Sequence, residues 1–235
     1  DLDELFVHDV ALARVLEPTD ATSVLHLPTR LRDLRGMDLF ASWPDTLATC
    51  GLDVSTGPVG PFRAEAFLRT AKSKTTAPML WLQHVLPGRV EWPLARGFRK
   101  PEYIERDAPR KLLVKNRTYV LLRRFSAKEA ARRLVAAPYL RDSIPAPVLG
   151  LENHLNFIHR QRGELEAREA SAFSALLNSP HFDAYFRISN GNTQVSATEL
   201  RALPLPPSSV LEMIAARLAH GATEDAAVVE VLGEV

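Results

Sequence analysis

The chain has 235 residues, of which 46% are hydrophobic, and it carries a net charge of +1 and a single cysteine. This length and composition are enough for one large hydrophobic core or two modest ones. No run approaches the roughly 18 consecutive apolar residues of a membrane-spanning helix, and the first residues show no signal-like pattern. We therefore predict a globular, cytoplasmic protein without a membrane partner or an internal disulfide.

Patterns in the first part of the chain predict two helices and three strands. The helices are expected over residues 31–40 and 45–50, and Gly51 would end the second one. The strands are expected over residues 52–55, 78–85 and 89–94, and the last two would form a β-hairpin.

The middle of the chain predicts two more strands, over residues 118–125 and 133–139, joined by a basic turn with the pattern Ser-x-x-Glu at Ser126. Beyond a proline cluster, residues 164–178, 181–188 and 210–219 predict amphipathic helices, and residues 222–235 are expected to be helical or frayed.

The predicted fold class is α+β, with a mixed or antiparallel β-sheet region followed by a helical C-terminal subdomain. We expect a helical or linker segment over residues 1–50, a β-rich recognition region over 51–148 and a mainly helical subdomain over 149–235.

The charge is concentrated in one segment. Residues 96–141 hold fourteen Lys and Arg against four acids, a local charge of +10, whereas residues 1–95 carry −3 and residues 142–235 carry −6. A concentrated basic segment is typical of a surface that binds a polyanion, with nucleic acid as the first candidate.

Catalytic and metal-binding motifs are missing from the sequence. It contains no phosphate-binding loop, no dinucleotide fingerprint, no His-Glu-x-x-His and no Gly-x-Ser-x-Gly. The seven histidines are scattered, so we expect neither a metal site nor catalytic residues in this chain.

Two segments favour binding. The basic turn from Arg123 to Arg133 supplies donors for phosphates and guanine edges, and its cations look dense and unpaired, although charged edge strands can carry the same residues. Residues 190–194 combine a turn with three amide side chains, which can pair with adenine or can simply end a helix at Asn190-Gly191.

These segments resemble the C-terminal target-recognition region of adenine-N6 DNA methyltransferases of bacterial restriction-modification systems, the Eco57I-like and TaqI-like group. The resemblance covers roughly residues 50–207, and its last block is also similar to specificity subunits of type I systems. Four blocks carry it: residues 53–63, residues 119–133, residues 150–156, and residues 177–206 with their Leu-Pro-Leu-Pro end.

The sequence also departs from those enzymes. It lacks the Asn/Asp-Pro-Pro-Tyr/Phe motif for the flipped adenine and the glycine-rich loop for S-adenosylmethionine, and its one Pro-Pro pair, Pro206-Pro207, has the wrong neighbours. The resemblance therefore implies a target-recognition part without the N-terminal methyltransferase domain. No cofactor is expected in this chain; S-adenosylmethionine is implied for that missing domain.

With that resemblance, double-stranded DNA is the expected partner. We expect point charges to contact phosphates and guanidinium or amide groups to contact base edges. The phosphate candidates are Lys111, Lys115, Arg117 and Lys128. The base-recognition candidates are Arg63, Arg123, Arg124, Arg132 and Arg133, with Asn192 and Gln194 as secondary choices and Ser126 beside them.

One competing hypothesis is a protein–protein docking module, in which the acidic, Ala-rich C-terminal helices bind another subunit and the basic segment binds an acidic protein. An RNA-binding domain ranks lower, because single-strand binders display aromatic platforms and the basic segment holds few aromatic residues.

Overall fold

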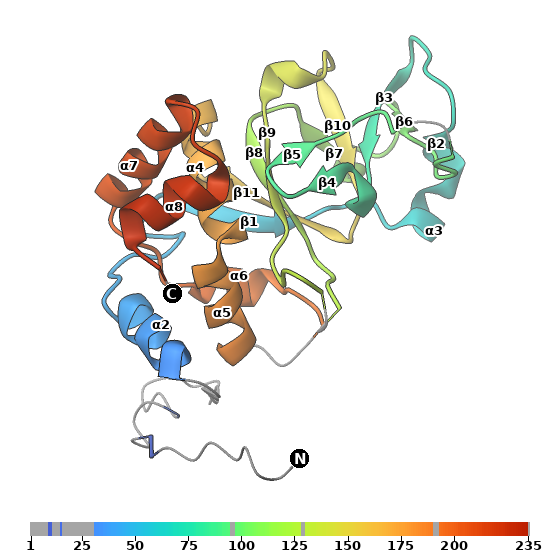
Figure 1. Ribbon diagram of the computed structural model, residues 1–235. Helices are drawn as coiled ribbons and strands as arrows, with labels where there is room; N and C mark the ends of the chain where they lie inside the picture. The colour runs from blue at the N-terminus through green and yellow to red at the C-terminus, as the bar shows by residue number, and fades with distance from the viewer. Residues whose placement is uncertain are drawn as a thin grey trace.

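The structure is a computed structural model that describes residues 9–10, 15, 31–94, 97–127, 130–189 and 193–234. Most helices lie on one side of the molecule, and the strands form two larger sheets and a two-stranded hairpin on the other side (Figure 1). The prediction of a mixed α+β fold with antiparallel and mixed sheets, followed by C-terminal helices, is confirmed.

A four-stranded antiparallel sheet lies next to the helices. Its strand order is β1-β11-β8-β9, so β1 pairs with a strand about one hundred residues further along the chain, for example Leu52 with Arg160. The strands are β1 (Leu52–Thr56), β8 (Tyr119–Arg123), β9 (Ala136–Tyr139) and β11 (Leu155–Arg160).

The five-stranded sheet is mixed. Strand β10 runs parallel to β3 on one side and antiparallel to β7 on the other. The order is β2-β6-β3-β10-β7, and the strands are β2 (Leu68–Arg69), β3 (Thr76–Leu80), β6 (Tyr103–Glu105), β7 (Leu113–Lys115) and β10 (Val148–Leu151).

The predicted hairpin is only partly right. Strands β4 (Val85–Leu86) and β5 (Arg89–Val90) do pair across Pro87-Gly88, where Gly88 takes a φ of +72°. The preceding apolar residues of β3 instead join the five-stranded sheet, because their pairing partners are β6 and β10.

Six helices of the described chain enclose one face of the four-stranded sheet or support its loops. Their bounds are α2 (Leu31–Ala41), α4 (Ala167–Asn178), α5 (Pro180–Ser189), α6 (Ala197–Ala202), α7 (Ser208–Ala219) and α8 (Glu224–Leu232). Short turns of helix occur at α3 (Pro61–Ala64), η2 (Glu65–Phe67), η3 (Leu82–His84), η4 (Arg110–Leu112) and η5 (Arg141–Ser143).

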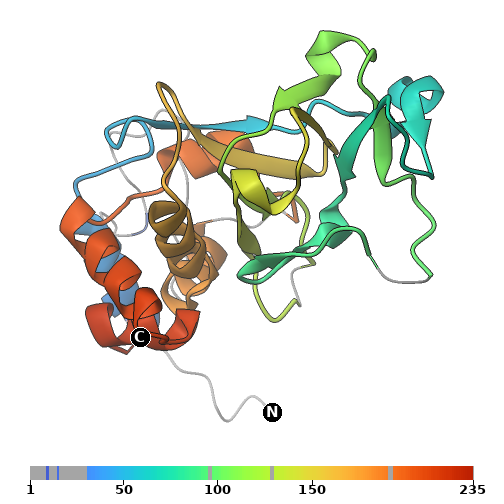
Figure 2. The ribbon, with the colours of Figure 1, turned by 90° about the horizontal axis from the view of Figure 1, so that it is seen from above.

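Strand β8 lies between two hydrophobic cores. Because successive side chains of a strand point to opposite faces, Val120 and Leu122 enter the core beneath the helices, whereas Tyr119 and Leu121 enter the core between the two sheets. A third cluster, around Met79 and Ile104, lies on the outer side of the five-stranded sheet. The molecule is thus layered as helices, sheet and sheet (Figure 2).

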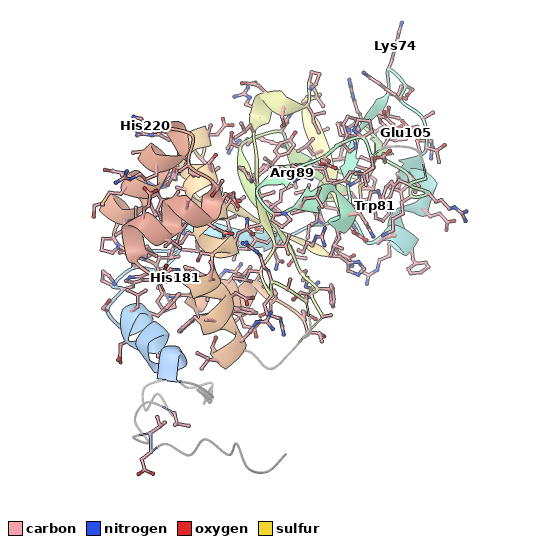
Figure 3. The ribbon with its side chains drawn as sticks, in the orientation of Figure 1. Lys74, Trp81, Arg89, Glu105, His181 and His220 are labelled. Carbon is pink, nitrogen blue, oxygen red and sulfur yellow. The ribbon has the colours of Figure 1, made fainter. Side chains whose placement is uncertain are left out.

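Side chains of the labelled residues in Figure 3 follow these layers. His181 and His220 lie in the helical layer, and Trp81 and Glu105 lie with the five-stranded sheet.

The predicted elements at 31–40, 52–55, 118–125, 133–139, 181–188 and 210–219 are confirmed, with shifts of a few residues at their ends. The predicted helix at 45–50 is wrong. It is a hydrogen-bonded turn in which Leu52 N–H reaches back to Leu47 O at 2.8 Å and Gly51 has a φ of +70°.

Strand β10 begins at residue 148, where we placed the end of the β-rich region, and β11 follows it, so β structure extends to Arg160. The helix predicted from residue 164 begins at Ala167. Among the described residues, no helix is both long enough and apolar enough to cross a membrane.

Candidate nucleic-acid interface

Four segments from distant parts of the chain meet at one end of the two sheets. After β1, Gly57 N–H donates to Leu155 O at 2.8 Å and Val59 N–H donates to Leu151 O at 2.9 Å. Asn153 N–H donates back to Val59 O at 2.9 Å. The loop after β1 is therefore fastened to the turn between β10 and β11.

The other two segments join the same place. Arg124, just past β8, donates its N–H to His154 O at 2.9 Å and accepts from Val195 N–H at 2.7 Å. The side chain of Asn156, buried in β11, donates to Val195 O at 2.8 Å and accepts from Thr56 Oγ1 at 2.9 Å. We call residues 57–63, 124–127, 152–154 and 193–196 the loop cluster.

Glycine is required where two of these segments touch. A Cβ atom at Gly57 would lie 2.1 Å from Glu152 O and 2.7 Å from Leu151 O, which are backbone atoms. A Cβ atom at Gly60 would meet only Asn153 Nδ2, at 3.9 Å. The loop can therefore approach the β10–β11 turn only because position 57 has no side chain.

The buried carboxylate of Glu152 orients the β10–β11 turn. Its Oε2 accepts from Leu82 N–H at 2.9 Å, and its Oε1 lies 3.0 Å from His154 Nδ1 and 3.6 Å from Lys100 Nζ. Lys100 also lies over the Trp81 ring, 4.5 Å from its centroid. A carboxylate that is 1% exposed needs such donors, and they fix where His154 emerges.

The loop cluster exposes aromatic and cationic side chains together. Phe62 is 94% exposed, Phe125 is 40% exposed, and the Phe125 ring meets His154 edge to face at 5.0 Å. Arg63 is exposed beside Phe62 on α3, whose Ala64 is fully buried and holds the short helix against the protein. The cluster thus combines charge, planar rings and amide groups.

Among the sequence candidates, Arg63, Arg124, Ser126 and Gln194 lie in this cluster. Arg124 Nη1 donates to Asn153 O at 3.1 Å, and its guanidinium lies beside the Phe125 ring. Phe125 pairs with Gln194 through a backbone bridge, and Ser126 N–H donates to Thr193 O at 3.1 Å. Lys128 and Asn192 lie outside the described residues.

Three other candidates are not the unpaired cations we expected. Arg123 Nε donates to Val85 O at 2.7 Å, and burial lowers the pKa of its guanidinium. Arg132 bonds to Asn178 O and, at 2.7 Å, to Asp225 Oδ2. Arg133 is 3% exposed and donates to Ser126 Oγ at 3.2 Å. These side chains fasten the end of β8 and the segment between β8 and β9 to neighbouring elements.

Two of the phosphate candidates, Lys115 and Arg117, lie away from the loop cluster. Lys115 and Arg117 precede β8 and line two adjoining hollows with Gly163 and Glu164, whereas Arg124 follows β8. Five strand residues at about 3.3 Å each place the two ends about 15 Å apart. Lys111 is exposed on η4, and Arg117 Nη1 donates to Gly163 O at 3.2 Å.

Sequence reasoning missed the side chains that shape or expose this surface: Phe62, Glu152, Asn153, His154 and Asn156. Phe62 stands next to Arg63 in the chain, but its exposure depends on how α3 docks. Among the described residues, no group of three or more His, Cys, Asp or Glu is placed to hold a metal ion.

No family model matches the chain. By sequence the chain is homologous to a part of type II methyltransferases. It is 31% identical over 228 residues to the type II methyltransferase M.PstI of Providencia stuartii, a match that covers 97% of this chain and 45% of that protein. It is 35% identical over 202 residues to the type II methyltransferase M.BsuBI of Bacillus subtilis, covering 84% of this chain and 39% of that protein. The chain thus spans less than half the length of these curated relatives.

Two solved structures are also similar to the chain. One is a chain from a type I restriction-modification system, with a TM-score of 0.41, 12% identity, and coverage of 80% of this chain and 43% of that chain. The other is the HsdS subunit from Thermoanaerobacter tengcongensis, with a TM-score of 0.38, 18% identity, and coverage of 95% and 44%.

Proposed function

We propose that this chain recognises a specific site on double-stranded DNA, as the target-recognition part of an S-adenosylmethionine-dependent adenine-N6 DNA methyltransferase of a bacterial, cytoplasmic restriction-modification system. Methyl transfer and cofactor binding would be the work of an N-terminal methyltransferase domain, because the motifs for both are missing from these 235 residues.

This proposal rests on the loop cluster, where segments from distant parts of the chain meet. Its segments come from the blocks on which the resemblance rests, yet they are separated by up to about 130 residues in the chain. A surface that recognises DNA needs cations for phosphates and planar donors or acceptors for base edges, and both kinds are present here.

We divide the candidate residues among three roles: contacts to bases, contacts to phosphates, and support of the loop. Arg63 and Arg124 are the base-recognition candidates that lie in the loop cluster, and Ser126 lies beside them. Lys115 and Arg117 are proposed to contact phosphates at a distance from the cluster, and Lys111, Lys128 and Asn192 keep the roles proposed from the sequence. Arg123, Arg132 and Arg133 are proposed to hold the loop rather than to contact bases.

Salt-dependent binding tests this function. Fluorescence anisotropy of the chain with a mixed-sequence duplex, titrated from about 50 to about 200 mM salt, should show affinity falling by orders of magnitude if several phosphates are contacted. Selection from a random duplex library would then give the preferred site. A matched control is Arg168→Ala, because Arg168 is an exposed arginine of the helical layer.

Arg63→Ala and Arg124→Ala should each weaken binding to the preferred site by about 1–3 kcal/mol, with Arg168→Ala unchanged. Absence of binding at the lowest salt, or equal effects of the three variants, would contradict a DNA-recognition surface at the loop cluster. Salt-insensitive binding of another protein subunit would instead favour the docking module.

A further inference from the structure

The guanidinium of Arg124 is held on several sides. Its Nη1 donates to Asn153 O at 3.1 Å. With the Gln194 amide oriented to satisfy both partners, Gln194 Oε1 accepts from Arg124 Nη2 at 2.8 Å and from Nε at 3.3 Å. The Phe125 ring lies 5.8 Å from the guanidinium carbon. The position and the plane of this side chain are therefore set before any ligand arrives.

These bonds leave a defined set of donors. A guanidinium has five N–H groups: one on Nε and two on each Nη. The contacts to Asn153 and Gln194 take one N–H from each of the three nitrogens. Among the described residues, this leaves one N–H on each Nη for an outside ligand, which is the number that a bidentate contact with guanine O6 and N7 needs.

The backbone around Gln194 fixes this residue against Arg124. Val195 N–H donates to Arg124 O at 2.7 Å, and Gln194 forms a bridge with Phe125. The amide oxygen of Gln194 is thus engaged by Arg124, although a glutamine side chain can also pair directly with adenine.

We propose that Gln194 is a positioning residue: it holds Arg124 so that the two remaining Nη donors contact one guanine, and it does not itself recognise a base pair. This inference rests on the proposed function. It predicts that Arg124 and Gln194 affect the preference at the same base pair of the site. Two independent base contacts would affect the preference at two different base pairs.

A double-mutant cycle tests the assignment. Arg124→Ala, Gln194→Ala and the double variant of the full chain are measured by anisotropy against the selected duplex and against duplexes with each base pair replaced in turn. Arg124→Ala should reduce the preference at one base pair by about tenfold or more. Gln194→Ala should reduce it at the same base pair and nowhere else, and the double variant should match Arg124→Ala.

Two further variants separate positioning from a merely structural role. Gln194→Glu keeps an acceptor for Arg124, so it should retain the preference at that base pair while its added negative charge weakens binding to all duplexes alike. Gln161→Ala is the control: it removes an exposed amide whose Nε2 donates to Leu52 O past the other end of β11. It should change neither the preference at that base pair nor the overall affinity for DNA. Circular dichroism and thermal unfolding check that each variant is folded.

The outcomes distinguish this inference from the proposed function. If the unmodified chain binds no DNA or prefers no sequence, the proposed function fails and this inference fails with it. If the unmodified chain has a preference but Gln194→Ala relaxes a different base pair, or the effects of the two substitutions multiply, Gln194 is an independent contact and only this inference is overturned.

Discussion

Arginines in a basic run can stabilise a fold as much as they bind a ligand. Arg132 and Arg133 follow one another in the chain, but one bonds to Asp225 of α8 and the other lies against the Phe186 ring of α5. Arg124, eight residues before Arg132, lies in the loop cluster. Neighbouring arginines therefore have different environments, and residue type alone does not distinguish them.

Phe62 offers a test at this scale. Because its side chain is 94% exposed, Phe62→Ala should leave the unfolding free energy unchanged within about 0.5 kcal/mol. It should weaken DNA binding by about 1 kcal/mol or more if the ring packs on the duplex. Anisotropy and urea unfolding measure the two quantities, and Met213→Ala, an exposed residue of α7, is the control. Reduced stability with unchanged DNA binding would show that Phe62 does not contact DNA.

His84 predicts how stability depends on pH. Burial lowers its pKa below the usual 6.5, although Glu102 opposes this shift. Its Nδ1 accepts from Trp81 N–H at 2.7 Å, so the neutral ring donates Nε2–H to Glu102 Oε1 at 2.8 Å. The unfolded chain then binds more protons below about pH 6.5, and the unfolding free energy should fall as the pH falls through that range.

Urea unfolding at pH 7.5 and pH 5.5 checks this expectation. His84→Asn keeps a side-chain acceptor that does not titrate, so it should show a smaller loss on acidification than the unmodified chain, despite lower stability at pH 7.5. The buried His181, whose pKa is also lowered by burial, accounts for a remaining part of the loss. Equal losses in both proteins would exclude His84 as a contributor.

At the scale of elements, the loop cluster depends on a close crossing of two backbones. Gly57→Ala would force its Cβ against Glu152 O, and we expect a loss of about 1–3 kcal/mol in unfolding free energy. The β10–β11 turn would also move, so DNA preference should fall more than this loss of stability explains.

Gly60→Ala is the matched control for that variant. Gly60 has a φ of −85° and room for a methyl group, so alanine should be tolerated there. Thermal unfolding compares the stability of the two variants, and anisotropy compares their DNA preference. Equal behaviour of the two would contradict a requirement for glycine at the crossing.

At the scale of the whole molecule, the segments of opposite charge partly compensate each other. Arg132 pairs with Asp225 at 2.7 Å, and Arg141 pairs with Glu164 at 3.3 Å, so acids of the C-terminal segment neutralise cations of the basic one. Part of the +10 charge of residues 96–141 is therefore structural, and the surface that faces a polyanion is smaller than the sequence indicates.

Methyl transfer is a property that also belongs to the scale of the whole molecule. We expect the 235 residues alone to transfer no methyl group from S-adenosylmethionine to DNA and to bind none of this cofactor, because they lack both motifs. Transfer of a radiolabelled methyl group to duplex DNA, and calorimetry with S-adenosylmethionine, measure the two. Under the proposed function, joining the chain to an N-terminal methyltransferase domain should restore transfer, to adenine N6. Transfer by the chain alone would contradict the proposal that this chain recognises the site and a separate domain transfers the methyl group.

Periodic apolar patterns were sufficient for the long helices and for β1, β8 and β9. Strands β10 and β11 were missed because Gly150 and Asn156 interrupt their apolar pattern, although each is buried by a partner from elsewhere in the chain. Helix α6 was missed because it is short, although Ser196 and Glu199 form a reciprocal cap at its start.

By itself the sequence determined the fold class, most long elements and the resemblance to a target-recognition region, since these follow from local periodicity and local motifs. Only the tertiary structure decided which cations are engaged within the protein and which lie in the loop cluster. The physical reason is that both depend on contacts between residues far apart in the chain, such as Thr56 with Asn156 and Arg132 with Asp225. A one-dimensional pattern does not contain the partners that bury or expose a side chain.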